Sequence, residues 1–283
     1  MNLDNTDTFQ AKVLSSDLIT PKSDAEEVRQ LVLQISQPDF KFEAGQSIAV
    51  VVPGPHEFGN KAHVRFYSIA GGEVGGGGRP SQIVIAVRRC FYIDEFSGEK
   101  IKGVASNYLC DLTPGSEISV RGPFRTAFEV PEDVNANMLM IGLGTGIAPF
   151  RAFVKKIFKS KGAWKGKVRL FYGARSGLEM AYMNDEKNDF ANYYDEETFK
   201  AFQAVSPKPH MDAPIEIGRS LEENAKEVWE LLSHNNTYVF LSGQHKLEGM
   251  LEKAFVKMAG SEENWQKRKA ELKAGGRWSE LLY

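Results

Sequence analysis

A glycine-rich turn offers the clearest chemistry in this sequence. Gly142, Gly144 and Gly146 stand at alternate positions after the apolar run Met138–Ile141. Pro149 follows in a segment of helical spacing, and proline suits the first turn of a helix because its missing N–H would be unpaired there. Glycine lets a backbone approach a ligand closely, and the free N–H groups at a helix start favour an anion. The pattern therefore predicts a site for a dinucleotide pyrophosphate.

The spacing of this turn leaves an alternative open. G-x-G-x-G-x-x-P is not the G-x-G-x-x-G fingerprint of dinucleotide-binding proteins, and no acidic residue stands at the distance expected for one that holds a ribose. The same residues could form a tight strand-to-helix turn that binds nothing. The motifs on either side of the turn have to decide between these interpretations.

A second candidate, the tetrapeptide Arg65–Ser68, closes an apolar segment earlier in the chain. Its arginine, tyrosine and serine could hold a pyrophosphate, face a ring and hydrogen-bond a ring edge. For an isolated match, an edge strand with a surface arginine is the better explanation. Further motifs follow it, however: the segment Gly98–Phe124, the glycine turn, the sequences FYGARS and YVFLSGQ, and a final aromatic residue, Tyr283.

This ordered series resembles the plant-type ferredoxin–NADP⁺ reductases through nearly the whole chain. That family has R-x-Y-S, then K-G-V-C-S-N-x-L-C-D-L-x-P-G, then G-T-G-I-A-P-F-R, then a strand that ends in Cys-Gly, and a C-terminal tyrosine. Ordered matches across two domains are far more specific than any one of them. The resemblance implies an antiparallel β-barrel FAD-binding domain at 1–131, followed by an α/β NADP(H)-binding domain with a doubly wound parallel sheet at 132–283.

The resemblance also implies roles for individual residues toward FAD. They are Arg65 and Ser106 on the pyrophosphate, with the backbone of Gly103, Val104 and Ala105 beside them; Tyr67 on one face of the isoalloxazine; Ser68 at its reactive edge; Tyr92 on the adenine; and Tyr283 on the other face of the ring. The aromatic at Tyr92 favours FAD over FMN. For Tyr283 the alternative is a frayed tail, the usual fate of a chain terminus.

A second set of residues is implied for the pyridine nucleotide. It comprises Gly144, Thr145, Gly146, Pro149, Gly243 and Arg88, the last at the position of a family lysine that meets the nucleotide pyrophosphate. Ser206, Lys208 and Arg175 remain available for an adenosine 2′-phosphate. Ser68, Ser242 and Tyr283 are the expected catalytic residues. No histidine neighbours Ser242 and G-x-S-x-G is not matched, so a nucleophilic serine is not indicated.

The sequence departs from the family pattern beside this second set. The family's Cys-Gly is Ser242-Gly243, and its carboxylate two residues before the terminal tyrosine is Leu281, with Glu280 one place out of register. The family's Ser-Arg and tyrosine around the 2′-phosphate become Ser206-Pro207 and Ile215. We therefore expect NADP(H) binding with NAD(H) also possible, and a preference of only about tenfold, or ~1.4 kcal/mol.

Two kinds of secondary structure must position these residues. From Phe9 to about Phe124, short β-branched and aromatic segments separated by glycine and proline predict a closed or nearly closed antiparallel barrel. One short helix, Ala105–Leu112, interrupts them. The glycine cluster at 71–80 is interpreted as a surface loop rather than a phosphate loop, because no helix follows it.

After about Val130, strands alternate with helices, which predicts a parallel, doubly wound sheet. Strands are expected at 138–141, 168–172, 202–205 and 238–241. One helix is expected to begin at Ser220 with Glu223 completing a capping box. Ligands of such sheets lie beyond the carboxyl ends of the strands. The natural boundary between the two halves is Pro131–Asp133.

Composition excludes several classes of function. The chain has 283 residues and a net charge of −2, so nothing indicates affinity for nucleic acid. No apolar run approaches the ~20 residues of a membrane span, and the polar N-terminus lacks the apolar segment of a signal peptide. Two cysteines and five histidines show no metal-type spacing. A cytoplasmic protein without a metal site is expected.

The expected function is that of an FAD-dependent oxidoreductase. It would exchange electrons between NADP(H) and a small one-electron carrier such as ferredoxin or flavodoxin. One alternative is the reductase component of an oxygenase, which would need a separate ferredoxin because two cysteines cannot ligate a cluster that takes four. Another is a flavin-binding subunit with weak turnover, which the substitutions at Ser242 and Leu281 make conceivable.

Overall fold

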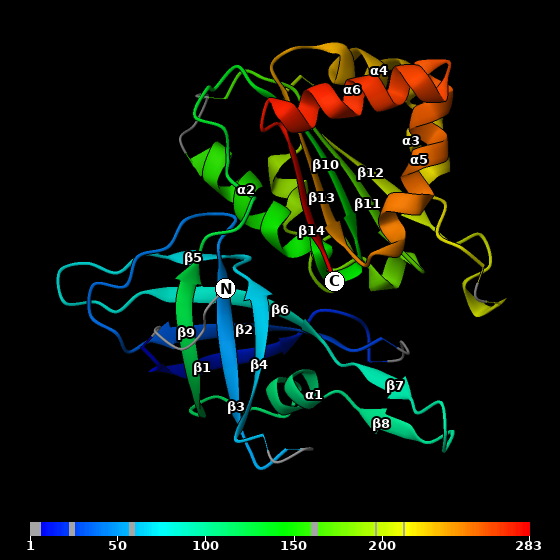
Figure 1. The fold of residues 1–283 in the computed structure, drawn as a ribbon. Helices are drawn as coiled ribbons and strands as arrows, with labels where there is room; N and C mark the ends of the chain where they lie inside the picture. Colours follow the sequence, from blue (N-terminus) through cyan, green and yellow to red (C-terminus); the bar gives the residue numbers. More distant parts are fainter. Residues whose placement is uncertain (1–6, 23–25, 57–59, 160–163, 196, 212) are drawn as a thin grey trace. The chain divides into compact units, whose positions relative to one another are not determined.

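The computed structural model describes residues 7–22, 26–56, 60–159, 164–195, 197–211 and 213–283 (Figure 1). The N-terminal segment before residue 7, expected to be polar rather than a signal peptide, lies outside these ranges. Contacts within the chain divide it into two compact units, Met1–Thr126 and Ala127–Tyr283. The division falls a few residues before the expected limit at Pro131. Phe128 accounts for this, because its buried ring packs on Phe150 of the second unit.

The first unit is built on antiparallel strands. Within the described residues they form a seven-stranded sheet in the order β4-β3-β9-β1-β2-β6-β5. Its strands are β1 (Phe9–Leu18), β2 (Val28–Ile35), β3 (Ser47–Pro53), β4 (Ala62–Ser68), β5 (Gly71–Glu73), β6 (Gln82–Arg88) and β9 (Glu117–Phe124). A separate hairpin joins β7 (Phe91–Ile93) to β8 (Lys100–Lys102), and one helix, α1 (Val104–Cys110), follows it.

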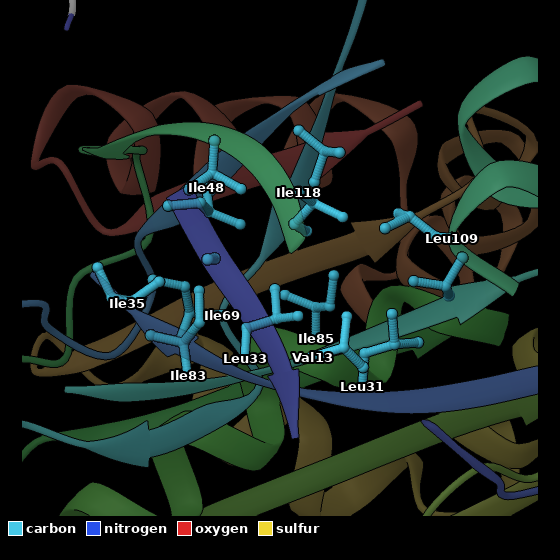
Figure 2. Close-up of a cluster of buried hydrophobic side chains, with 14 of the residues drawn as sticks. Val13, Leu31, Leu33, Ile35, Ile48, Ile69, Ile83, Ile85, Leu109 and Ile118 are labelled. Atoms are coloured by element: carbon cyan, nitrogen blue, oxygen red, sulfur yellow. The ribbon is translucent and has the colours of Figure 1, made fainter. Parts of the chain in front are cut away.

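One face of this sheet forms a hydrophobic core (Figure 2). In β2, Leu31, Leu33 and Ile35 lie at alternate positions and are fully buried, as the alternation in the sequence predicts. Ile83 and Ile85 of β6 join them. Because β4 also lies against β6, the sheet curls on itself and the antiparallel barrel prediction is confirmed. The helix α1 contributes buried Leu109 to the same core.

The second unit is built on parallel strands. Within the described residues they form a five-stranded sheet in the order β12-β11-β10-β13-β14. Its strands are β10 (Asn137–Leu143), β11 (Val168–Ala174), β12 (Phe199–Val205), β13 (Thr237–Gly243) and β14 (Trp278–Leu282). Its helices are α2 (Ile147–Lys159), α3 (Ile217–Glu223), α4 (Ala225–Ser233), α5 (Lys246–Ala259) and α6 (Glu262–Ala274).

Helices cover both faces of the parallel sheet, which confirms the doubly wound prediction (Figure 1). On one face, α3 to α6 bury a cluster that includes Ile141, Leu241 and Trp265. On the other face, Phe153 of α2 packs edge-on against Phe240 of β13. Burial on both faces explains why β11 is buried at every position and shows no alternation of apolar and polar residues; its one charged residue, Arg169, is paired with Glu227.

One predicted helix is wrong in this unit. The segment expected to form a single helix from Ser220 is two helices, α3 and α4, that meet at Asn224. Ser220 lies inside α3, where its N–H donates to the Glu216 carbonyl at 3.0 Å, so it forms no capping box with Glu223. The Asn224 side chain donates to the Ser220 carbonyl at 2.9 Å. A short amide that bonds the backbone in this way competes with a continuous helix.

The structure also defines two element ends. The helix α2 begins at Ile147, so Pro149 lies within its first turn and does not open it. The C-terminal segment is a strand, β14, and not a frayed tail. Trp278 anchors it, because its ring packs on Trp265 and Phe255. None of the helices in the described ranges is long and apolar enough to cross a membrane.

Candidate functional site

The glycine turn connects β10 to α2 through the short 3₁₀ helix η3 (Gly144–Gly146). Gly144 has a φ of +57°, and a Cβ added to it would meet nothing within 4 Å. Gly146 is required for a different reason: a Cβ there would lie 2.2 Å from the carbonyl oxygen of Ser242. Gly144 thus provides a turn conformation with clearance beside it, and Gly146 lets the turn pack on β13.

Thr145, Gly243 and Tyr283 come together at the carboxyl edge of this sheet. The N–H of Tyr283 donates to the Gly243 carbonyl at 3.0 Å. Its hydroxyl lies 2.7 Å from Thr145 Oγ1. Ser242, the residue before the last of β13, pairs with Gly142 and is fully buried, and its hydroxyl has no hydrogen-bond partner among the residues described. The structure therefore places the predicted residues of β10, β13 and the C-terminus at one edge, with Pro149 buried behind them.

Glu280 does not replace the carboxylate that the family carries at the position of Leu281. Glu280 accepts a hydrogen bond from Trp278 Nε1 and lies 3.5 Å from Lys273 Nζ of α6. Successive residues of a strand point to opposite faces. Leu281 therefore lies on the face opposite Glu280, and that position carries no charge.

The ends of β11 and β12 carry the residues predicted for a 2′-phosphate. Arg175 donates from Nε and Nη2 to Glu179 Oε1, at 2.8 Å and 2.6 Å. Ser206 donates its hydroxyl to the Ala213 carbonyl at 2.7 Å, and it is buried. Lys208 is exposed. Of these groups, the Lys208 ammonium alone forms no hydrogen bond or ion pair within the described ranges, while the Ser206 hydroxyl and the Arg175 guanidinium already have partners.

In the first unit, Arg65 and Tyr67 share one face of the edge strand β4. Arg65 is exposed and forms no hydrogen bond or ion pair with any described residue. Tyr67 packs against the hydrophobic core, and burial raises the pKa of its phenol well above the usual range, so the hydroxyl stays protonated. Ser68 ends the strand and is half-buried. The strand thus offers an available cation and a fixed ring on one face, and the Ser68 hydroxyl at its end.

The start of α1 is tied to the chain that follows β6. Ser106 Oγ accepts from the Cys90 N–H at 3.1 Å and donates to the Gly103 carbonyl at 3.3 Å. Asn107 Nδ2 donates to two backbone carbonyl oxygens, that of Cys90 at 2.8 Å and that of Gly103 at 2.9 Å. Of the predicted residues here, Ala105 is buried and Val104 is partly exposed. The Asn107 side chain therefore ties the start of α1 to the segment after β6.

Ion pairs hold the two arginines at the end of β6. Arg88 Nη1 lies 3.1 Å from Glu26 Oε2. Arg89, which sequence reasoning missed, binds Glu27 at 2.6 Å and Asp111 at 2.8 Å. The hydrogen bond from Arg89 lowers the pKa of the Glu27 carboxyl below its usual range. Arg88, predicted to meet a nucleotide pyrophosphate, is therefore already neutralised by a neighbouring strand.

Tyr92 lies on the β7–β8 hairpin, opposite Ile101 in the register. Its ring is 50% exposed, so one face remains available for stacking. Phe91 occupies the other face of the hairpin, where the Lys100 ammonium lies 4.2 Å from its ring centroid. Within the described parts of the chain, no group of three or more histidine, cysteine or acidic residues could hold a metal ion.

The comparisons with known proteins agree with this arrangement. Residues 140–253 match the family model described as "Oxidoreductase NAD-binding domain". A chloroplastic leaf ferredoxin–NADP reductase of Oryza sativa subsp. indica is 33% identical over 282 residues, which cover 97% of this chain and 76% of the relative. A ferredoxin–NADP reductase of Spirulina sp is 31% identical over 281 residues, 97% of this chain and 95% of the relative.

Solved structures extend the likeness to the fold. The ferredoxin–NADP⁺ reductase of Plasmodium falciparum matches with a TM-score of 0.71 at 18% identity, over 100% of this chain and 98% of that one. A mutant of the same protein, solved in complex with 2′P-AMP, matches with a TM-score of 0.71 over 98% of this chain and 96% of that one. Both units of the chain therefore have the folds seen in that protein.

Proposed function

The chain belongs to the plant-type ferredoxin–NADP⁺ reductase family, and from this premise we propose that it is an FAD-dependent oxidoreductase that exchanges electrons between NADP(H) and ferredoxin. Identity above 30% across almost the full length of this chain supports the assignment in both units. Flavodoxin is proposed as a second carrier, because both carriers deliver one electron at a time.

The carboxyl edge of the parallel sheet is the observation that carries the proposal. Gly144 leaves open space where a side chain would stand, so a pyrophosphate can approach the backbone there. The N–H groups at the start of α2 face the same turn and favour an anion. Thr145, Gly243 and Tyr283 meet beside it. The same edge is where ligands of doubly wound sheets bind.

The first unit fits an FAD in three respects. Arg65 offers a charge that no described residue neutralises. The Ser106 hydroxyl donates only a long bond of 3.3 Å to Gly103, which a phosphate oxygen could replace. Tyr92 presents half of its ring to solvent, as a residue that stacks on an adenine requires. When bound, FAD would accept two electrons together as one hydride and release them one at a time.

The proposed catalytic residues act by position. Tyr67 is held by the core for packing on a flavin ring, and Ser68 follows it at the strand end. The buried hydroxyl of Ser242 is held where the family has a thiol. Tyr283 is held by Thr145. Hydride transfer requires no general acid or base, so the uncharged Leu281 is compatible with the reaction.

Two measurements test the proposed function. The purified protein should contain non-covalent FAD at one per chain, identified by chromatography after release. Rapid mixing with NADPH should then reduce this flavin, and oxidised ferredoxin should reoxidise it. Release of FMN, or a flavin that NADPH does not reduce, would contradict the proposal. A flavin-binding subunit with weak turnover would instead hold FAD but fail to reduce artificial one-electron acceptors in steady state.

A cytoplasmic location is proposed together with this function. Cys90 and Cys110 are both free thiols, and free thiols are typical of proteins in a reducing compartment. Fractionation of cells that express a tagged chain checks this proposal, and recovery outside the cytoplasmic fraction would contradict it.

A further inference from the structure

An ion pair lies just beyond the end of β11, in the segment that also contacts the end of β12. Arg175 directly follows β11, and its carbonyl accepts the Ser206 N–H that follows β12 at 3.1 Å. The guanidinium of Arg175 is bound by Glu179 in the short 3₁₀ helix η4 (Gly177–Glu179). The Glu179 side chain is 10% exposed and that of Arg175 is 34% exposed. Water therefore screens this pair less than it screens a surface pair.

The pair changes what this edge can recognise. A phosphate monoester on the 2′-oxygen of adenosine carries close to two negative charges at neutral pH. Arg175 alone would attract it, but the Glu179 carboxylate cancels that charge at a distance of 2.6 Å. A carboxylate at such an edge can instead accept a hydrogen bond from the free 2′-hydroxyl of NAD(H). The exposed Lys208 is then the cation left for the 2′-phosphate.

We infer that Glu179 is a specificity-determining residue, which lowers the preference for NADP(H) and lets the site accept NAD(H). The inference rests on the proposed function, because it concerns the same nucleotide site. Neutralising Glu179 removes a carboxylate that repels the 2′-phosphate and raises the net positive charge beside Arg175. Nucleotides without that phosphate lose at most one hydrogen bond. The affinity for NADP(H) should therefore rise relative to the affinity for NAD(H), and the two affinities should not change by the same factor.

The test uses two fragments that differ only in the 2′-phosphate. Dissociation constants of adenosine 2′,5′-bisphosphate and of 5′-AMP are measured by calorimetry on the FAD-loaded protein. Glu179→Gln should tighten the bisphosphate about tenfold and change 5′-AMP by less than threefold. The double variant Arg175→Ala, Glu179→Gln, in which both charges are absent, should return the bisphosphate close to the wild-type value. The NADPH-to-NADH ratio of kcat/KM should rise about tenfold in Glu179→Gln.

Glu223→Gln is the matched control, since Glu223 pairs with Arg219 at the same i,i+4 spacing on the exposed surface of the same unit. It changes the net charge equally and should leave both fragments unaffected. Unchanged melting temperature and flavin spectrum establish that each variant folds. If 5′-AMP binds but Glu179→Gln shifts the bisphosphate no more than the control does, the inference fails alone. If neither fragment binds wild type, the proposed nucleotide site and the inference fail together.

Discussion

The two candidate sites of this chain are built in different ways. In the nucleotide-binding unit, backbone geometry brings strand ends together. Gly144 supplies a left-handed turn, and the close backbone contacts that define the edge are those of Gly146 and Gly243. In the flavin-binding unit, side-chain contacts hold the elements together: Ser106 at the start of α1 bonds Cys90, and Arg89 at the end of β6 pairs with Glu27. Four of the departures that we noted, at Ser242, Leu281, Pro207 and Ile215, fall in the nucleotide-binding unit, whereas in the flavin-binding unit Arg88 replaces a family lysine and keeps its charge. A site built by backbone tolerates changed side chains, whereas a site built by side chains does not.

The largest effect is expected from a substitution that disrupts the backbone packing of the nucleotide site. In Gly146→Ala, the new methyl group would lie 2.2 Å from the Ser242 carbonyl oxygen, so the turn or β13 must move. Overpacking of this kind costs ~1–3 kcal/mol or more. We expect a lower melting temperature and NADP⁺ binding weakened more than tenfold.

Gly249→Ala is the control for that substitution. Gly249 lies in α5, where an added Cβ meets nothing within 4 Å. Alanine is the better helix former by ~1 kcal/mol, so stability should rise slightly and NADP⁺ binding should not change. If Gly146→Ala behaves like this control, the nucleotide edge is not held together by its backbone.

The next effect probes the site built by side chains. Arg65→Ala removes the unpaired charge on β4 and should weaken FAD binding by ~1.5–3 kcal/mol, the range for a hydrogen bond to a charged group. Equilibrium dialysis of the apoprotein measures it. Arg79→Ala, at an exposed loop arginine of the same unit, is the control. Equal FAD affinity in the two variants would remove Arg65 from the proposed site.

The dependence of stability on pH is a third property in which the two units should differ. Burial raises the pKa of the Cys110 thiol from 9.0 to about 12, and this thiol lies in the flavin-binding unit. A raised pKa means that the folded state favours the protonated thiol. This contribution to stability is complete below pH 9 and is lost as the pH rises toward 12, by ~1.4 kcal/mol for each unit above 9.

Chemical denaturation at pH 8, 9 and 10, with excess FAD present, measures that loss. Cys110→Ala should be less stable at pH 8 and should lose less stability than wild type between pH 8 and 10. Buried tyrosines with raised pKa values, Tyr67 in this unit and Tyr172 and Tyr182 in the other, lower stability only as the pH reaches about 10, where an unfolded tyrosine ionises, and they do so equally in both variants. Identical slopes in wild type and Cys110→Ala would show that the thiol does not titrate as its burial requires.

The smallest expected effect concerns Tyr283. Tyr283→Phe keeps the ring and removes the 2.7 Å bond to Thr145, worth ~0.5–1.5 kcal/mol. If nucleotide must displace this contact, NADP⁺ should bind up to about tenfold more tightly. Tyr283→Ser also removes the ring and should raise flavin fluorescence if the ring covers the flavin. If neither variant changes the NADP⁺ dissociation constant or the fluorescence, the tyrosine plays no part in the site.

The fold follows from the sequence where burial imposes a period. The alternation of apolar residues in β2, and the alternation of strands with helices after Val130, were enough to predict an antiparallel sheet and then a parallel one. The carboxyl edge could also be predicted, because parallel strand ends must lie together. The residue roles carried over from the family remain predictions that the experiments above address.

What the sequence could not show depends on contacts between distant residues or on weak local competition. The break at Asn224 rests on one amide bonding to Ser220, and helical periodicity continues across it. The strand β14 exists because Trp278 finds Trp265, a pairing that no local pattern reveals. Glu179 could have been noticed, since it stands four residues after Arg175 at a strand end, but its effect on the charge of Arg175 required the 2.6 Å contact.

The close packing of β10 on β13 also bears on the entropy of binding. Gly243 has a φ of +137°, and a Cβ there would lie 2.6 Å from the Leu143 carbonyl oxygen, reciprocating the approach of Gly146 to Ser242. Because these two strand ends are in backbone contact, they have little conformational entropy to lose when a ligand binds. Ordering a mobile loop would oppose binding by ~1–2 kcal/mol per residue, but here that ordering takes place when the domain folds. A pyrophosphate thus meets a surface that is already rigid, and its contacts contribute to affinity without first having to shape the turn.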